Sequence, residues 1–156
     1  MLNAINMSHV WVFDQDEALD FYVGQLGLEV GSDFDLGFMR WLTVCVPGDP
    51  ARQILLERPA PPSVDEATAG QVRDAISKGA SGFAVGFETD DCHRTYEELV
   101  AKGVEFSEEP TERAYGIDMA LRDPFGNHIR IVQSFPPEEV ARRMQEMPSF
   151  DPAEHA

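Results

Sequence analysis

A weak internal repeat constrains the fold of this chain more than any other feature of its sequence. The stretches DQDEALDFYVGQLGLEV (14–30) and DDCHRTYEELVAKGVEF (90–106) each predict a helix of about three turns, then a glycine and the start of a strand. A strand precedes each helix, at 5–13 and at 82–89, and two further strands follow it around a Pro/Gly turn. Each copy therefore predicts a β-α-β-β-β order, which gives an α+β fold built from two βαβββ modules.

The repeat also sets the expected division of the chain. We expect the first module at 1–59, a helical connector at 60–81, the second module at 82–135, and a short C-terminal helix with a tail at 136–156. In the connector, Ser63 and Glu66 have the spacing of a capping box, and Gly79 is a suitable helix end. The connector is therefore predicted to be a helix packed at the edge of the domain.

Composition and charge exclude several classes of function. The chain has 156 residues, of which 43% are hydrophobic, and a net charge of −16, which repels nucleic acid and anionic membrane surfaces. No apolar run approaches the roughly 18 residues that a membrane span needs, and residues 1–7 lack the features of a secretory signal. We therefore expect a cytoplasmic globular protein. Cys45 and Cys92 have no CxxC spacing and are expected to be small apolar fillers.

Alternation along the strands predicts which side chains share a face. Ile54 and Leu56 of one strand, and Ile129 and Ile131 of another, suit a face packed against helices, as do Phe83, Val85 and Phe87. The side chains on the opposite faces combine apolar walls with a few polar groups, which is typical of a small-molecule cleft. The residues expected to line this cleft are Met7, His9, Trp11, Gln53, Leu55, Glu57, Ala84, His128 and Arg130. Arg40 alternates with Trp41, so only one of the two can face the cleft, and Tyr115 and Met119 are further candidates.

The repeat together with LRDPFGNHIRIVQ (121–133) resembles the vicinal oxygen chelate superfamily, which includes glyoxalase I, bleomycin-resistance proteins and extradiol dioxygenases. The resemblance spans residues 5 to 134. It implies that the two modules form a curved mixed sheet around a cleft, with helices on the outer face. It also implies a site either within one chain or across a dimer, and exposed sheet edges favour a homodimer.

Metal-dependent members of the family place four ligands in the cleft, and the resemblance projects these positions onto or near Met7, Gln53, Gly82 and Arg130. These residues are poor ligands, since a divalent cation prefers imidazole, carboxylate or thiolate and a guanidinium repels it. No cofactor is therefore expected. A shifted site made of His9, Glu57 and His128 remains an alternative with acceptable ligand chemistry, although each residue lies two positions from a projected ligand.

The leading hypothesis is a metal-free protein that binds a small organic molecule, sequestering a drug or a natural product as bleomycin-resistance proteins do. The competing hypothesis is an enzyme of the same superfamily, in which His9 or His128 is the base, Glu57 a second proton-transfer group and Arg130 the partner of a developing oxyanion. A third hypothesis is a regulatory or orphan domain whose cleft has no ligand.

Overall fold

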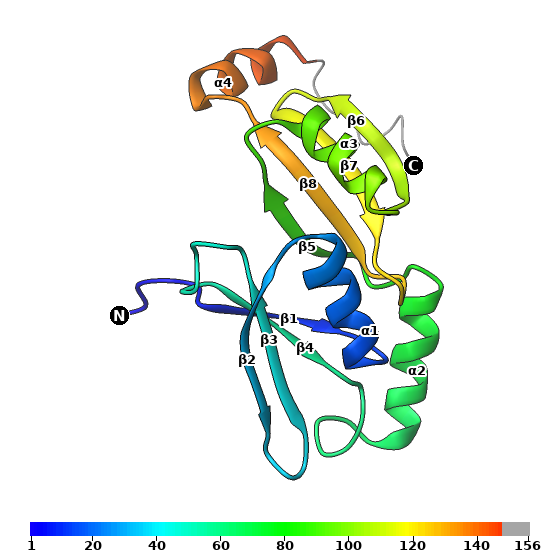
Figure 1. Cartoon of the computed structure of the whole chain (residues 1–156). Coiled ribbons are helices and arrows are strands. Elements are labelled where there is room, and N and C mark those ends of the chain that lie inside the picture. The colour runs from blue at the N-terminus through cyan, green and yellow to red at the C-terminus, as the bar shows by residue number, and fades with distance from the viewer. Residues whose placement is uncertain (148–156) are drawn as a thin grey trace, which may run out of the picture.

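The computed structural model describes residues 1–147 and contains two four-stranded sheets (Figure 1). The elements of the first module are β1 (Met7–Trp11), α1 (Gln15–Leu19) continued by the π-helix η1 (Asp20–Gln25), β2 (Glu29–Asp35), β3 (Arg40–Cys45) and β4 (Gln53–Glu57). Those of the second are β5 (Phe83–Glu88), α3 (Cys92–Ala101), β6 (Phe106–Glu112), β7 (Gly116–Arg122) and β8 (His128–Ser134). Helix α2 (Glu66–Ser77) connects the modules, and α4 (Pro137–Glu146) follows β8.

The two sheets have the same topology. The strand orders are β1-β4-β3-β2 and β5-β8-β7-β6. In each sheet the first and last strands of the module pair in parallel, and the remaining pairs are antiparallel. The predicted α+β class with two βαβββ modules is therefore confirmed.

Equivalent residues start and end the repeated helices. The Asp14 carboxylate caps α1 by accepting hydrogen bonds from the amides of Asp16 and Glu17, and Asp91 caps α3 by accepting from the amide of Arg94. After the helices, Gly27 and Gly103 take φ values of +80° and +84°, a left-handed conformation that favours glycine. The repeat in the sequence is thus a repeat of helix start and stop signals.

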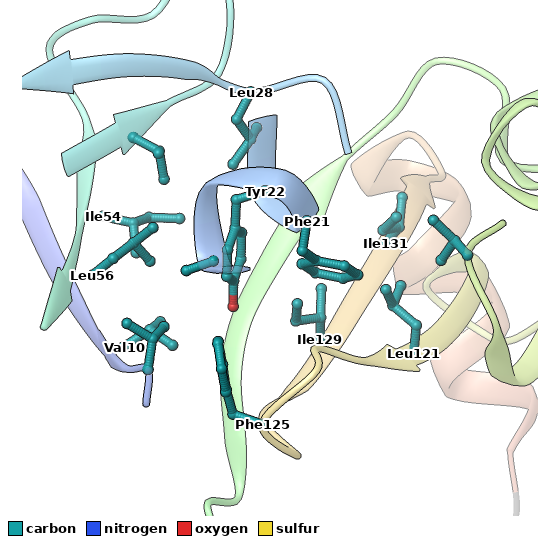
Figure 2. Packing of buried hydrophobic residues seen from close by; sticks show 14 of the residues in the cluster. Val10, Phe21, Tyr22, Leu28, Ile54, Leu56, Leu121, Phe125, Ile129 and Ile131 are labelled. Carbon is teal, nitrogen blue, oxygen red and sulfur yellow. The ribbon is translucent and has the colours of Figure 1, made fainter. Parts of the chain in front are cut away.

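The helix-packed faces of the two sheets share one apolar core. Figure 2 shows Tyr22 of η1 beside Ile54 and Leu56 of the first sheet, while the neighbouring Phe21 points toward Ile129 and Leu121 of the second. Leu121 lies on β7, the third strand of its sheet, so η1 can reach it only if the sheets fold toward each other over their helix-packed faces. The opposite faces, here called the first and second outer faces, therefore point away from each other.

The DPFGN turn before β8 joins the modules by buried hydrogen bonds. The Tyr22 hydroxyl donates to Asp123 Oδ2 at 2.8 Å, and Asp123 Oδ1 accepts from the amides of Phe125, Gly126 and Asn127. Asn127 Nδ2 donates to the carbonyl of Trp11 at 2.7 Å. Burial first, and then the neighbouring Asp123 carboxylate, raise the pKa of Tyr22, so its hydroxyl remains a hydrogen-bond donor. The turn thereby fixes the start of β8 against the end of β1.

The connector is helical as predicted, but its cap differs. Asp65 caps α2 by accepting from the amide of Thr68, whereas the Ser63 hydroxyl bonds to Glu57 and does not cap the helix. Gly79, at φ +76°, follows the end of the helix. Of the predicted C-terminal region, α4 is observed, and residues 148–156 lie outside the described part. No helix within residues 1–147 has the length and apolar character needed to cross a membrane.

Candidate functional site

The first outer face carries most of the predicted site residues. The register pairs Met7 with Gln53, His9 with Leu55 and Trp11 with Glu57, so these side chains alternate with the buried Val10, Ile54 and Leu56. The face continues onto β3 through Thr43, which lies opposite Leu55, and through Trp41 two residues earlier. Its residues are Met7, His9, Trp11, Trp41, Thr43, Gln53, Leu55 and Glu57.

Arg40 lies on the other side of this sheet, contrary to the expectation that it lines the site. Arg40 lies on the same face of β3 as Leu42 and Val44, which are buried in the core. Its guanidinium contacts Asp16 of α1 at 2.7 Å and Asp33 of β2 at 2.8 Å. Trp41 takes the place on the outer face, because alternation allows only one of these two neighbours to do so.

His9 forms the most reactive arrangement on the first outer face. Its Nε2 lies 2.9 Å from Glu57 Oε2, and the Trp11 indole packs against the imidazole in a T-shaped contact with ring centroids 4.2 Å apart at 83°. The His9 side chain is 34% exposed and that of Glu57 is 13% exposed. A half-exposed imidazole beside a shielded carboxylate can accept a hydrogen bond from a ligand or move a proton.

The other polar groups of this face satisfy one another. The Thr43 hydroxyl donates to Gln53 Oε1 at 2.6 Å, and Gln53 Nε2 donates to the carbonyl of Pro50 at 3.0 Å. Leu55 is 8% exposed, and Met7 is 37% exposed at the end of the face. These residues therefore supply an apolar wall whose polar groups are already hydrogen-bonded.

The second outer face carries Arg130 and His128 of β8, with Gly86 of β5 and Asp118 and Ala120 of β7 as neighbours. A register shift between Phe83 and Val85 corrects two predictions about β5. Phe83, expected in the core, pairs with His128, is 60% exposed and lies over Gly86. Ala84, expected in the cleft, packs against the core instead. The extra residue of the bulge reverses the alternation at this point.

Arg130 is already neutralised by carboxylates on its own face. Its Nε and Nη2 lie 2.8 Å and 2.7 Å from Asp118 Oδ2, and Nη2 lies 3.3 Å from Glu108 Oε2. Arg113 pairs with Glu108, and its Nε is 3.6 Å from Asp118 Oδ1. Two arginines therefore meet two carboxylates, and the cluster has no net charge to offer an anionic ligand.

Tyr115 belongs to the same cluster. Its hydroxyl donates to Asp118 Oδ2 at 2.6 Å, and the residue is 40% exposed. Burial alone would raise the pKa of Asp118, but hydrogen bonds from Tyr115 and Arg130 outweigh it and lower that pKa. The same hydrogen bond raises the pKa of Tyr115. Met119, the neighbouring candidate, is fully buried in the core and does not belong to the site.

His128 stands at the start of the second outer face. The Phe83 ring is nearly perpendicular to it, with centroids 6.3 Å apart at 86°. Burial, followed by the positive charges of Arg122 and Arg130, lowers the pKa of His128, so the ring is neutral at physiological pH. A neutral imidazole offers one donor and one acceptor to a ligand.

The predicted site residues thus fall into two groups on separate faces. His9 and Glu57 are in contact on the first face, whereas His128 lies on the second, so the alternative shifted metal site is not assembled within one chain. Within residues 1–147, no three His, Cys, Asp or Glu side chains form a group that could hold a metal. The projected family positions do not fit a metal either, because the Arg130 guanidinium occupies one of them and engages the nearby carboxylates.

One cavity lies between the two modules. It has a volume of about 430 Å³ and occupies the seam between the edge strands β1 and β5. Met7 and Gln53 line it from the first module, and Val85, Phe87 and Glu88 line it from the second. Only these first two residues of the predicted set contribute to it, so the seam cavity is the margin of the site and not its centre.

Sequence reasoning missed several members of the two faces. Asp118 could have been found as a lone acid alternating with Met119 and Leu121 in an apolar strand. Phe83 could not, because no local signal marks the bulge that moves it outward. The spacing of Ser63 and Glu66 was misleading, because the Ser63 hydroxyl bonds to Glu57 and does not cap the helix.

Comparisons with known proteins agree with this architecture. A model of the Glyoxalase/Bleomycin resistance protein/Dioxygenase superfamily matches residues 4–131. The protein YurT of Bacillus subtilis is 34% identical over 130 residues, which cover 83% of this chain and 98% of YurT. The crystal structure of UcmS2 has a TM-score of 0.81 at 35% identity and covers 86% of this chain and 100% of its own. The crystal structure of TnmS3, described as an antibiotic binding protein from Streptomyces sp. CB03234, has a TM-score of 0.69 at 25% identity. The match covers 86% of this chain and 98% of TnmS3. The chain belongs to the Glyoxalase/Bleomycin resistance protein/Dioxygenase superfamily.

Proposed function

We propose that this chain is a metal-free binding protein that sequesters a small organic molecule of drug or natural-product type, in a site completed by a homodimer. The observation that carries the proposal is the state of the polar groups on the outer faces. Arg130 is paired with Asp118 and Glu108, and Gln53 with Thr43. Groups that satisfy one another supply shape and orientation for a ligand, whereas catalysis needs groups available to the reacting atoms.

Half-buried or exposed aromatic side chains on both faces indicate the character of the ligand. Trp11 and Trp41 lie on the first outer face, and Phe83 and Tyr115, at 60% and 40% exposure, lie on the second. Large exposed aromatic groups mark surfaces that bind a partner or a ligand. A flat apolar molecule with a few polar substituents fits such walls.

A homodimer would bring the two faces together. Within one chain they point apart, and the edge strands β1 and β5 have no partner on their outer sides in residues 1–147. In a two-fold dimer, the first outer face of one copy can meet the second outer face of its partner, and symmetry then creates two equal sites. His9 and Trp11 would face Arg130 and His128 across each site.

The relatives support the same class of function. TnmS3 is described as an antibiotic binding protein, and it shares the fold over 86% of this chain. Resistance by sequestration of such a compound is therefore part of the proposal.

Intrinsic fluorescence provides a direct test. The chain has only two tryptophans, Trp11 and Trp41, and both lie on the first outer face. We expect a panel of aromatic and cationic antibiotics to include at least one compound that changes the emission saturably. Val132→Arg, which places a charge on the second outer face, should abolish the response, while Val100→Arg on the exposed surface of α3 should not.

Metal addition separates this proposal from a metalloprotein. Melting scans with and without Zn²⁺, Ni²⁺, Mn²⁺ and Fe²⁺ should show no specific stabilisation, because a metal that binds the folded chain would raise its melting temperature. A stoichiometric metal in the purified protein or a clear stabilisation by an added metal would contradict the proposal. So would the absence of a fluorescence response to every antibiotic of the panel.

A second candidate function rests on the His9–Glu57 contact at 2.9 Å. In a metal-independent isomerase or lyase, His9 would be the base and Glu57 would orient it. Turnover of a methylglyoxal-type or carboxylic substrate that disappears in His9→Ala would favour this enzyme over the binding protein.

A further inference from the structure

We propose that Ser63 and Glu57 are positioning residues that hold His9 as the Nε2–H tautomer, so that its Nδ1 accepts a hydrogen bond from the ligand. The inference rests on the proposed binding function and deepens it by naming the chemistry of one ligand group. The group at His9 is a hydrogen-bond donor, such as a phenol or another hydroxyl.

A chain of hydrogen bonds leads from the connector to the first outer face. Ser63, in the segment between β4 and α2, donates its hydroxyl proton to Glu57 Oε1. The other carboxylate oxygen, Oε2, lies 2.9 Å from His9 Nε2. Ser63 therefore restrains the rotation of the carboxylate, and the carboxylate in turn faces one particular ring nitrogen.

The nature of these partners decides where the imidazole proton lies. A carboxylate only accepts hydrogen bonds, so the nitrogen that faces it carries the hydrogen. In the neutral ring Nδ1 is then left with a lone pair. The hydrogen bonds of the described residues include no other contact of the His9 ring, and the Trp11 indole packs against the ring in a T-shaped contact with centroids 4.2 Å apart.

The oxygens around His9 already accept hydrogen bonds, whereas its Nδ1 does not. Thr43 and Gln53 bond to each other, and the second oxygen of Glu57 is taken by Ser63. A ligand atom that reaches His9 therefore meets apolar walls and an acceptor nitrogen that has no hydrogen-bond partner among the described residues. A donor group satisfies that nitrogen, whereas an ether or carbonyl oxygen would oppose it.

The tautomer can be measured without any ligand. The full chain has four histidines, and long-range ¹H–¹⁵N correlation spectra at pH 8 distinguish the two nitrogens of each neutral ring. The His9 signals are those missing from the spectrum of His9→Gln. We expect a protonated Nε2 and an unprotonated Nδ1 in the wild type, a mixture of tautomers in Glu57→Ala, and an intermediate shift in Ser63→Ala. Ser77→Ala is the matched control, since that hydroxyl bonds only to the carbonyl of Asp74 in its own helix.

A matched pair of probes tests the ligand chemistry. 2-Naphthol carries a hydroxyl donor, and 2-methoxynaphthalene has the same ring system without the donor. We expect 2-naphthol to bind the wild type about fivefold more tightly, the ratio typical of one neutral hydrogen bond. The ratio should fall to about one in His9→Ala and to about two in Ser63→Ala, and remain unchanged in Ser77→Ala.

The outcomes separate the two proposals. A protonated Nδ1 in the wild type, or equal binding of the two probes, would overturn this inference while leaving sequestration intact. Failure of both probes to bind would overturn the inference, and the absence of any response from the antibiotic panel would overturn it together with the proposed function. A tautomer that is unchanged in Glu57→Ala would show that the carboxylate does not set it.

Discussion

Replacing Arg130 with methionine should destabilise the protein, because the arginine balances a buried carboxylate. The side chain of Asp118 is 2% exposed and receives two of the Arg130 contacts, at 2.8 Å and 2.7 Å. Removing one partner of a buried pair costs about 3–5 kcal/mol. Because the Arg130 side chain is 26% exposed, we expect a cost near the lower end of this range. Tyr115 and Arg113 remain near the carboxylate and reduce the loss further. We expect a loss of about 2–3 kcal/mol in the free energy of unfolding, or about 4–12 °C in melting temperature.

A double-mutant cycle tests the reason for this loss. If the cost arises from an uncompensated charge, then Asp118→Asn should cost little in the Arg130→Met background, and the coupling energy should reach about 1–2 kcal/mol. Urea unfolding at constant pH and low salt measures all four proteins. Arg113→Met is the matched control, because its nearest atom is 3.6 Å from the same carboxylate, and its coupling should be smaller. Additivity of Arg130 and Asp118 within about 0.5 kcal/mol would refute the argument that Arg130 is neutralised in place.

Three further predictions concern stability. Tyr22→Phe removes the buried bond to Asp123 and should cost about 1.5–3 kcal/mol by urea unfolding, and a loss below 0.5 kcal/mol would contradict the proposed link between the modules. The pKa of His128 is lowered from its ordinary value of 6.5, so its contribution to stability is present above that pH and lost as the pH falls below it, because the unfolded chain then binds the proton more readily. Between pH 7.5 and pH 5 the melting temperature should therefore fall less steeply in His128→Asn than in the wild type. Parallel curves of melting temperature against pH would disprove this. Gly126→Ala, with φ at +108° and an added Cβ 2.3 Å from a carbonyl oxygen, should cost at least about 2 kcal/mol, whereas Gly70→Ala in open space should be neutral or stabilising on thermal unfolding.

The faces of individual strands could be predicted from the sequence because alternation is a local property. Arg130 between Ile129 and Ile131 was assigned correctly, and the same parity rule places Trp41 outward once Leu42 is assigned to the core. The rule failed at Phe83, where a bulge inserts one residue into β5. Bulges depend on pairing with a distant strand, so a local pattern does not reveal them.

The assembly of the site could not be predicted, because it depends on contacts between modules. The wedge of Phe21 and Tyr22 between the sheets sends the two outer faces in opposite directions, and nothing in the helix pattern of 14–30 specifies it. The pairing of Arg130 with Asp118 also joins residues from different strands. An arginine interpreted from the sequence as a ligand anchor is, in three dimensions, part of a neutral cluster.

Mixed dimers test the central claim most directly, namely that a ligand site is formed by the first outer face of one copy and the second outer face of another. His9→Arg blocks the first face and Val132→Arg blocks the second, so neither variant should bind alone the antibiotic that the wild type binds. A heterodimer purified with two different affinity tags, and confirmed by light scattering, contains one doubly blocked site and one intact site. We predict one ligand bound per heterodimer and two per wild-type dimer by calorimetric titration. A heterodimer that binds nothing, or a wild type that binds its ligand as a monomer, would contradict the account.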